Sequence, residues 1–372
     1  MKSLLSAVFF IIVLSGFSQD YNSFLYSNKN FEAADSGSLK FRINTTSFFK
    51  NNEYFNYITE GYTNIGYFVQ PSLVYTAFPN LQFEAGGHFL SFSGLNKFHQ
   101  TLPVFRAHYT NHKGFHFVMG TIYGTLNHKL IEPIYRFENY IEKNTENGIQ
   151  LIFDKKFFNL DIWVDWEQFI FQNDINQEHI SGGYSGSINL LKLKDIEFSI
   201  PFQSTIYHEG GQVDLANKSD LLLVNTASGL TIEKKNNNGF IKSISLSGFY
   251  LTYGDFSDEQ YKRYKNGNAV FSNVFIKTLA LNFFAGYWSG HKYISTKGEP
   301  LFNAVSQMYT TYFEPDKDLL LLKFIYERNL YKGVLLGVRL ETYYGLIYNK
   351  TDFSYGVHLV FDRDFFIGKE KR

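Results

Sequence analysis

The chain has 372 residues, of which 44% are hydrophobic, 19% aromatic and 19% charged, with 35 basic and 35 acidic side chains and no cysteine. The absence of cysteine excludes disulfides, thiolate metal sites and a cysteine nucleophile, and the balanced charge excludes a general attraction to nucleic acid. So high an aromatic content is incompatible with a disordered chain.

The first eighteen residues have the pattern of a secretory signal peptide. A basic start precedes an apolar run over 4–14, and Gly16 and Ser18 are small residues at positions −3 and −1 of a cleavage site. The run is short for a membrane-spanning helix, which needs about 20 residues, so we expect cleavage after Ser18 rather than an anchor. Residues 19–36 then form an N-terminal lead without a clear strand, either a periplasmic arm or a small plug.

The mature chain shows period-two alternation of apolar and polar residues. In one segment Phe158, Leu160 and Ile162 alternate with polar residues, and such alternation over about ten residues indicates a strand with one apolar and one polar face. Each segment is long enough for a tilted transmembrane strand, and fourteen strands remain an alternative count. About sixteen segments lie near residues 37–50, 65–78, 81–92, 99–110, 115–124, 147–155, 157–171, 183–193, 195–207, 219–233, 240–253, 268–276, 278–288, 318–328, 334–346 and 352–362.

The connections between these segments alternate between short and long. Every short turn joins an even strand to the next odd one, as at 111–114 and 194–195, whereas long connections such as 125–146 and 289–317 follow the odd strands. Short periplasmic turns opposite long extracellular loops are typical of outer-membrane barrels. The pattern predicts an all-β fold, a closed antiparallel transmembrane β-barrel over residues 37–366, followed by a C-terminal tail at 367–372. A soluble exported β-sandwich or β-solenoid is the alternative.

On this architecture the whole mature chain resembles a Gram-negative outer-membrane β-barrel protein, and its size and strand count are similar to those of general porins. The resemblance carries no family motif and therefore transfers no residue roles. It implies passive diffusion of small hydrophilic solutes through a channel that contacts outer-membrane lipid. The alternative is a non-channel barrel that serves as a scaffold or partner in envelope assembly, secretion or the binding of a surface glycan. A protein partner or a second copy of the chain is left open by the sequence.

The polar faces of the strands supply candidates for the pore lining. Three acidic candidates share one strand, and a basic pair on the first strand is expected one strand away from a charged pair on the fifteenth. This arrangement predicts a transverse field across a pore, and wall charges that neutralise one another are the alternative. The candidates are Lys40, Arg42, Glu84, Arg106, Asp161, Asp165, Glu167, Arg339 and Glu341.

The third long connection, 125–146, corresponds in position to the loop that narrows the pore of general porins. Its apolar side chains could pack against the inner wall while Glu132, Arg136 and Glu138 face the channel as constriction residues. A surface loop or short helix outside the barrel is the alternative.

The sequence contains no HExxH, GxSxG, phosphate-loop or GxGxxG motif. Ser204 and Ser228 are candidate nucleophiles by their strand face alone, and His108 and His116 approach each other across one turn. From these observations we expect no catalytic residues, no metal and no cofactor, and a protein that is not an enzyme.

Overall fold

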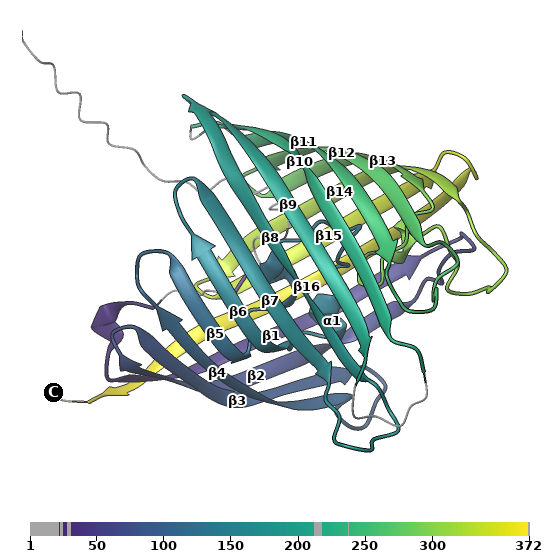
Figure 1. Cartoon of the computed structure of the whole chain (residues 1–372). Helices are drawn as coiled ribbons and strands as arrows, with labels where there is room; N and C mark the ends of the chain where they lie inside the picture. Colours follow the sequence, from purple (N-terminus) through teal and green to yellow (C-terminus); the bar gives the residue numbers. More distant parts are fainter. Residues whose placement is uncertain (1–21, 23–24, 28–30, 212–217, 237, 371–372) are drawn as a thin grey trace, which may run out of the picture.

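A computed structural model describes residues 22, 25–27, 31–211, 218–236 and 238–370. The predicted signal peptide and its cleavage site lie outside the described residues. Over the described chain, sixteen antiparallel strands close into one barrel in which each strand pairs with its sequence neighbours and β1 pairs with β16 (Figure 1). The strands are β1 (Ser38–Glu53), β2 (Thr63–Phe78), β3 (Leu81–Phe92), β4 (Gln100–Thr110), β5 (Phe115–Thr121), β6 (Asn147–Asp154), β7 (Phe158–Gln168), β8 (Glu178–Leu193), β9 (Ile196–Gly210), β10 (Leu221–Lys235), β11 (Ile241–Asp255), β12 (Asn266–Thr278), β13 (Leu281–His291), β14 (Asp316–Tyr331), β15 (Val334–Gly345) and β16 (Lys350–Lys369).

Closure depends on the pairing of the first and last strands. The register runs from Ser38 opposite Lys369 to Glu53 opposite Phe353. This pairing satisfies the backbone groups of both strands inside the membrane, where water is absent and an open edge is not tolerated. The closed antiparallel barrel predicted from the alternation is confirmed, with β16 continuing three residues beyond the predicted barrel end at 366.

Strand β14 shows why the alternation produces a barrel wall. Its residues Leu320, Leu322 and Phe324 are 43%, 52% and 43% exposed on the outer, lipid-contacting face, whereas Lys323 between them is 0% exposed inside the barrel. Successive side chains of a strand point to opposite faces, so one strand presents hydrocarbon to lipid and a charge to the lumen.

The connections confirm the predicted asymmetry. The turns that join even to odd strands have two to five residues, as at 194–195 and 236–240, whereas most connections at the other end are longer. The short exception at that end is 346–349, between β15 and β16. By the rule for outer-membrane barrels, the long loops are extracellular and the turns periplasmic.

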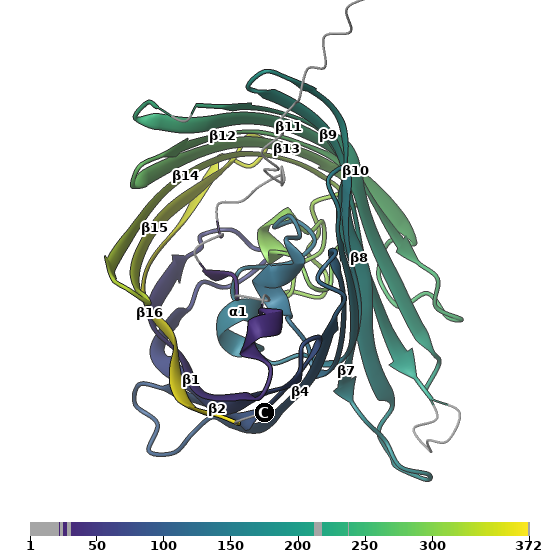
Figure 2. The same ribbon diagram turned by 90° about the vertical axis from the view of Figure 1, so that its left-hand side faces the viewer.

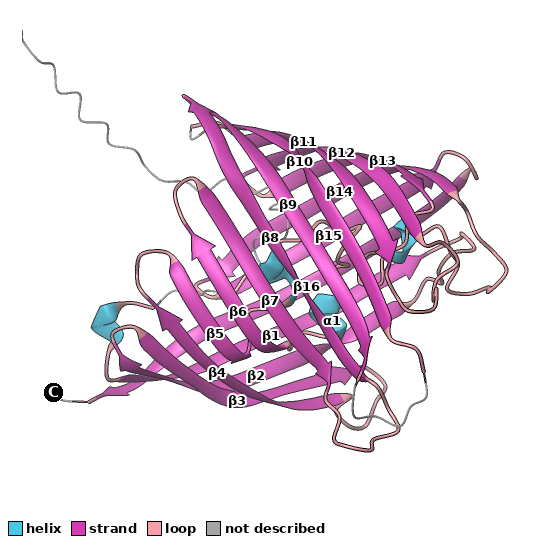
Figure 3. Cartoon of the chain, viewed as in Figure 1, coloured by secondary structure: helices cyan, strands magenta, loops and turns pink. Residues whose placement is uncertain are grey.

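Two of the long loops enter the barrel. The inward loop, residues 122–146, contains the 3₁₀ turn η3 (Thr125–His128) and the helix α1 (Asn139–Glu142). Figure 2 shows α1 inside the ring of strands, and Figure 3 shows the short helical turns against the strand walls. The capping loop, residues 292–315, contains the 3₁₀ turn η4 (Pro300–Phe302), and η2 (Ala33–Asp35) precedes β1. None of the helices in the described chain is long and apolar enough to cross a membrane.

Much of the inner face of the wall from β10 to β14 is apolar. Ile131 and Ile134 of the inward loop and Phe302 of the capping loop pack there in one buried cluster with Phe271 and Trp288 of the wall. Burying each such side chain contributes about 1.5–3 kcal/mol. The expectation of a uniformly polar inner face therefore holds for only part of the wall, because loop side chains take the place of water along the rest.

The topology can be tested because the chain has no cysteine of its own. We expect a membrane-impermeant maleimide to label Gln172→Cys, in the β7–β8 loop, on intact cells. We expect Asn238→Cys, in the β10–β11 turn, to be labelled only after the outer membrane is permeabilised. The reverse pattern would contradict the orientation.

Candidate functional site

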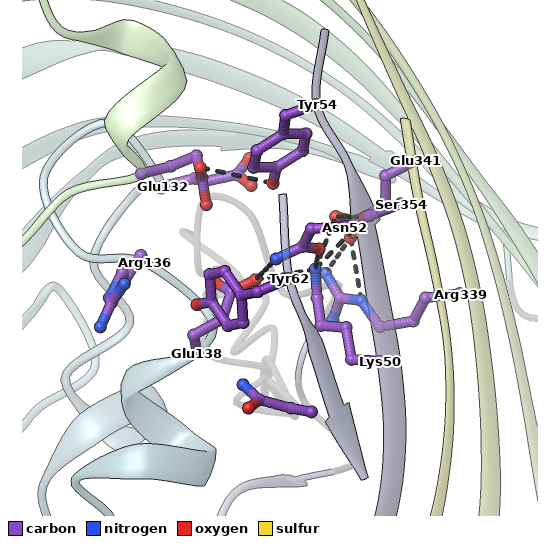
Figure 4. Close-up of polar contacts among 12 residues, drawn as sticks. Lys50, Asn52, Tyr54, Tyr62, Glu132, Arg136, Glu138, Arg339, Glu341 and Ser354 are labelled. Atoms are coloured by element: carbon purple, nitrogen blue, oxygen red, sulfur yellow. Dashed lines mark hydrogen bonds and ion pairs between the residues drawn. The ribbon is translucent and has the colours of Figure 1, made fainter. Parts of the chain in front are cut away.

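A cluster of buried charges lies where the inward loop meets the wall. Three cations come from the wall, Lys50 on β1, Lys323 on β14 and Arg339 on β15, and none is more than 3% exposed. Ammonium and guanidinium groups at such depth are stable only when carboxylates pair with them. Figure 4 shows Lys50 and Arg339 converging on Glu341 and Ser354.

Each of these cations has a carboxylate partner. Lys50 lies 2.9 Å from Glu138, and Lys323 contacts Glu132, so two wall cations hold the inward loop in place. Arg339 binds Glu341 of its own strand at 2.5 Å. The phenol of Tyr343 donates to Glu132 at 2.6 Å, which adds a charge-assisted hydrogen bond to the same attachment.

A fourth carboxylate, Glu299, has no ion-pair partner within the described residues. It belongs to the capping loop, is 3% exposed, and its backbone N–H donates to the carbonyl of Glu132 at 3.0 Å. Burial, followed by the charges of Glu138 and Glu132, raises the pKa of Glu299 to about 8. Lys50 and Lys323 already pair with other carboxylates, so they do not hold Glu299 in its charged form. This carboxyl group therefore exchanges its proton close to neutral pH.

Glu299 lines a cavity of about 450 Å³ in the extracellular half of the barrel. Tyr54 lines the same cavity, and its hydroxyl lies 3.5 Å from Oε1 of Glu299. Arg136 is also part of the lining and binds Glu142 at 2.5 Å. The cavity thus combines a titratable carboxyl, a phenol and a guanidinium in one polar pocket.

A second cavity of about 310 Å³ adjoins the first. The two share Arg136, Pro300 and Gln307 in their linings. The second one reaches the ends of β7 and β9 through Glu167 and Tyr207. We call the two cavities together the extracellular basin.

The histidine and serine candidates do not assemble a nucleophile and its base. His128 is held between Glu146 at 2.8 Å and Asp161 at 3.1 Å, and although burial opposes it, these two carboxylates raise its pKa to about 9. The imidazole is therefore held mainly in its protonated form, with both ring nitrogens facing carboxylates. The hydroxyl of Ser204 donates to the backbone carbonyl of Asn225 at 3.0 Å.

The other serine and histidine candidates lie elsewhere in the barrel. Ser228 faces outward on β10 and is exposed. His108 is hydrogen-bonded to His116 at 2.9 Å and to Tyr123 at 3.2 Å. None of these side chains lines the extracellular basin.

The structure places part of the predicted pore lining at the periplasmic end. Lys40 pairs with Asp35 at 3.1 Å. Arg42 lies 3.2 Å from Glu84, which also binds Arg106 at 2.6 Å. These four candidates therefore form paired charges near the turns, and their role in a pore stays a prediction.

The acidic candidates on β7 are bound by the loops. Asp161 contacts His128 as described above, Asp165 accepts the backbone N–H of Asn147 at 2.8 Å, and Glu167 lies 3.3 Å from Lys143. Their polar groups are thus engaged by the inward loop and its continuation into β6, and they do not form an open acidic stripe.

The expected neighbourhood of Arg339 and Glu341 needs a correction. They lie beside Lys50, which is 3.8 Å from Glu341, and not at the level of Lys40 and Arg42. The reason is the length of β16, which pairs with β1 well beyond the end of β15, so the periplasmic end of β1 has no β15 residue at its level.

Sequence analysis did not select Lys50 or Glu299. Lys50 and Arg42 both occupy even positions of β1, so the same alternation places both side chains on the inner face. Extending the alternation to the end of the strand therefore predicts that Lys50 faces the lumen. Glu299 stands in an irregular loop, where no periodicity reports the direction of a side chain.

The attachment of the inward loop can be tested at Lys323. We expect Lys323→Met to lower the free energy of unfolding by about 3–5 kcal/mol, because Glu132 is left buried without its counter-charge. The measurement is the denaturant midpoint of the refolded barrel, read from the mobility of unboiled samples on a gel.

Lys143→Met is the matched control, since that side chain is 56% exposed and its ion pair contributes at most about 1 kcal/mol. The double variant Lys323→Met/Glu132→Gln should recover part of the loss. Equal midpoints for Lys323→Met and Lys143→Met would contradict the attachment.

Solved structures with the same fold are outer-membrane proteins. OprD of Pseudomonas aeruginosa is 8% identical over 90% of this chain and 96% of its own, with a TM-score of 0.53. OpdL of the same species is 10% identical over 88% and 99%, with a TM-score of 0.53. A loop-deleted OmpT of Vibrio cholerae is 12% identical over 88% and 100%, with a TM-score of 0.51. At these identities the similarity establishes the fold alone, that of an outer-membrane β-barrel.

No curated protein matches the chain by sequence. The family model described as lipid A 3′-O-deacylase-type matches residues 31–370. The expectation that the protein is not an enzyme is therefore wrong, since this description is that of an enzyme. With nearly its whole described length matched, the chain belongs to the lipid A 3′-O-deacylase-type family.

Proposed function

We propose that the protein hydrolyses an acyl ester of a glycolipid in the outer leaflet of the outer membrane, with Glu299 as the general base. The observation that carries the proposal is the unpaired, buried carboxyl group of Glu299 beside a polar cavity. A pKa of about 8 is suited to a base that works near neutral pH. The family description supports the class of reaction.

The chemistry requires only water and groups of the chain. The Glu299 carboxylate takes a proton from a water molecule while the water oxygen bonds to the ester carbonyl carbon. The guanidinium of Arg136, on the same cavity, stabilises the negative charge that develops on the carbonyl oxygen. The carbon–oxygen bond to the sugar then breaks, Glu299 returns the proton to the sugar oxygen, and a fatty acid and a free hydroxyl leave.

An outer-leaflet lipid has an apolar approach to the basin. Glu167 lines the basin at the end of β7, and Trp166 beside it faces the lipid. The β7–β8 loop that follows carries Phe169 and Phe171, which are 64% and 74% exposed. These exposed rings extend the apolar outer surface of β7 toward the loops, which supports an approach of the acyl chains from this side.

The assignment of the base is tested by Glu299→Gln. We expect release of fatty acid from lipid A in detergent micelles to fall by roughly 10²–10⁴-fold, since the amide cannot accept the proton. In the unaltered protein the rate should increase as the pH rises through about 8, because the active form of Glu299 is the deprotonated one. Mass spectrometry of the released fatty acid measures both.

Glu60→Gln is the matched control, because Glu60 lines the same cavity but is exposed. Its activity and pH profile should equal those of the unaltered protein. Activity retained by Glu299→Gln with the same pH profile would rule out this base, and no fatty acid from the unaltered protein would rule out the function.

The second candidate function is passive diffusion of small hydrophilic solutes. It is supported by a cavity of about 420 Å³ near the periplasmic end, lined by charged residues that include Arg42, Glu84 and Arg106. The buried cluster around Lys50 and Lys323 lies between this cavity and the extracellular basin, and a continuous path would require the inward loop to move.

Planar-bilayer recordings separate the two candidates. We expect the refolded chain to show no persistent conductance steps, and a variant lacking residues 126–142 to show them, because that deletion removes the loop from the lumen. Persistent steps with a cation or anion preference from the unaltered chain would favour solute diffusion.

A further inference from the structure

The second cavity of the extracellular basin has an excess of positive charge. Its lining brings together side chains from the inward loop, the capping loop, the β11–β12 loop and the ends of β7, β9 and β10. Four cationic side chains face two carboxylates there: Arg136, Lys143, Lys262 and Lys297 against Glu167 and Glu209.

Arg136 is already paired with Glu142, which is not part of the lining. The two carboxylates of the lining do not neutralise all of the other three cations. Lys143 and Lys297 share the single carboxylate of Glu167, the first at 3.3 Å and the second in closer contact. Glu209 accepts a hydrogen bond from the phenol of Tyr207 at 2.7 Å. The shared Glu167 therefore carries one negative charge beside two ammonium groups.

Lys262 is the cation of this cavity that has no carboxylate partner among the described residues. Its ammonium lies 4.8 Å from the ring of Tyr261 and forms no ion pair with any residue that the structure describes. Burial lowers the pKa of Lys262, and the more distant charges of Glu209 and Asp255 offset this only in part. A half-buried ammonium group loses part of its hydration. An anion that enters the cavity would stabilise this charge through charge-assisted hydrogen bonds.

We infer that the second cavity is a binding site for a phosphate group carried on a sugar, with Lys262 and Lys297 as its principal ligands. The inference rests on the proposed function in one respect, namely that the sugar is the headgroup of the same glycolipid. Because the two cavities share Arg136, Pro300 and Gln307, a phosphate held near Lys262 orients the headgroup so that an ester on it lies toward Glu299.

Calorimetric titration of the refolded full chain in detergent micelles tests the site. The probes are glucose 1-phosphate, inorganic phosphate and glucose. We expect glucose 1-phosphate to bind with an affinity that falls as salt is added, and Lys262→Gln to weaken it about tenfold through the loss of one charge-assisted contact. Glucose should not bind. Tighter binding of glucose 1-phosphate than of inorganic phosphate identifies a headgroup site, and the reverse order would overturn it.

Lys265→Gln is the matched control, because Lys265 belongs to the same loop but is exposed and outside the cavity lining. An equal loss of affinity in both variants, or no phosphate-dependent binding at all, would overturn the inference. The titration is repeated on Glu299→Gln, where binding should persist. If the unaltered protein binds glucose 1-phosphate but releases no fatty acid, the phosphate site is supported and the proposed function is rejected. If it releases fatty acid but does not bind the sugar phosphate, the proposed function is supported and the phosphate site is rejected.

Discussion

The contact between Lys323 and Glu132 joins the barrel wall to the loop inside it, and the arrangement of the extracellular basin depends on it. Lys323 is fully buried, so its charge requires a partner at that depth. The partner comes from the inward loop, which also places Glu138 beside Lys50. Once these pairs form, Glu299 of the capping loop is left as a buried carboxyl group beside two carboxylates. Burial first, and then the charges of Glu138 and Glu132, raise its pKa.

Closure of the barrel was predictable because a strand in a membrane has few options. Lipid on one face and polar groups on the other impose period two, and turn residues mark where the chain reverses. Segments such as Phe158–Gln168 and Leu281–His291 therefore fall close to their predicted ranges. The turns at 111–114 and 194–195 were also predictable, since short connections leave the chain few conformations.

The contents of the lumen were harder to predict, because a loop residue has no period. Ile131 packs inside the lumen because Phe271 and Trp288 form an apolar surface there. Those two residues lie on strands far from Ile131 in the sequence, so the loop sequence alone does not predict this contact. Inward-facing apolar residues on β11 to β13 resemble ordinary strand residues in the sequence. Their significance appears only when the loops that cover them are seen, and the same holds for Glu299.

A sixteen-stranded ring is wide enough to hold water, and here much of that width holds two loops. The loops close the middle of the barrel and leave a basin that opens on the extracellular side. The same ring of strands can therefore surround either an open or a filled lumen, depending on the loops that enter it. The wall provides rigid cations such as Lys50 and Lys323, and the loops provide the carboxylates. A change of loop sequence therefore alters the chemistry of the lumen without altering the pairing of the strands that cross the membrane.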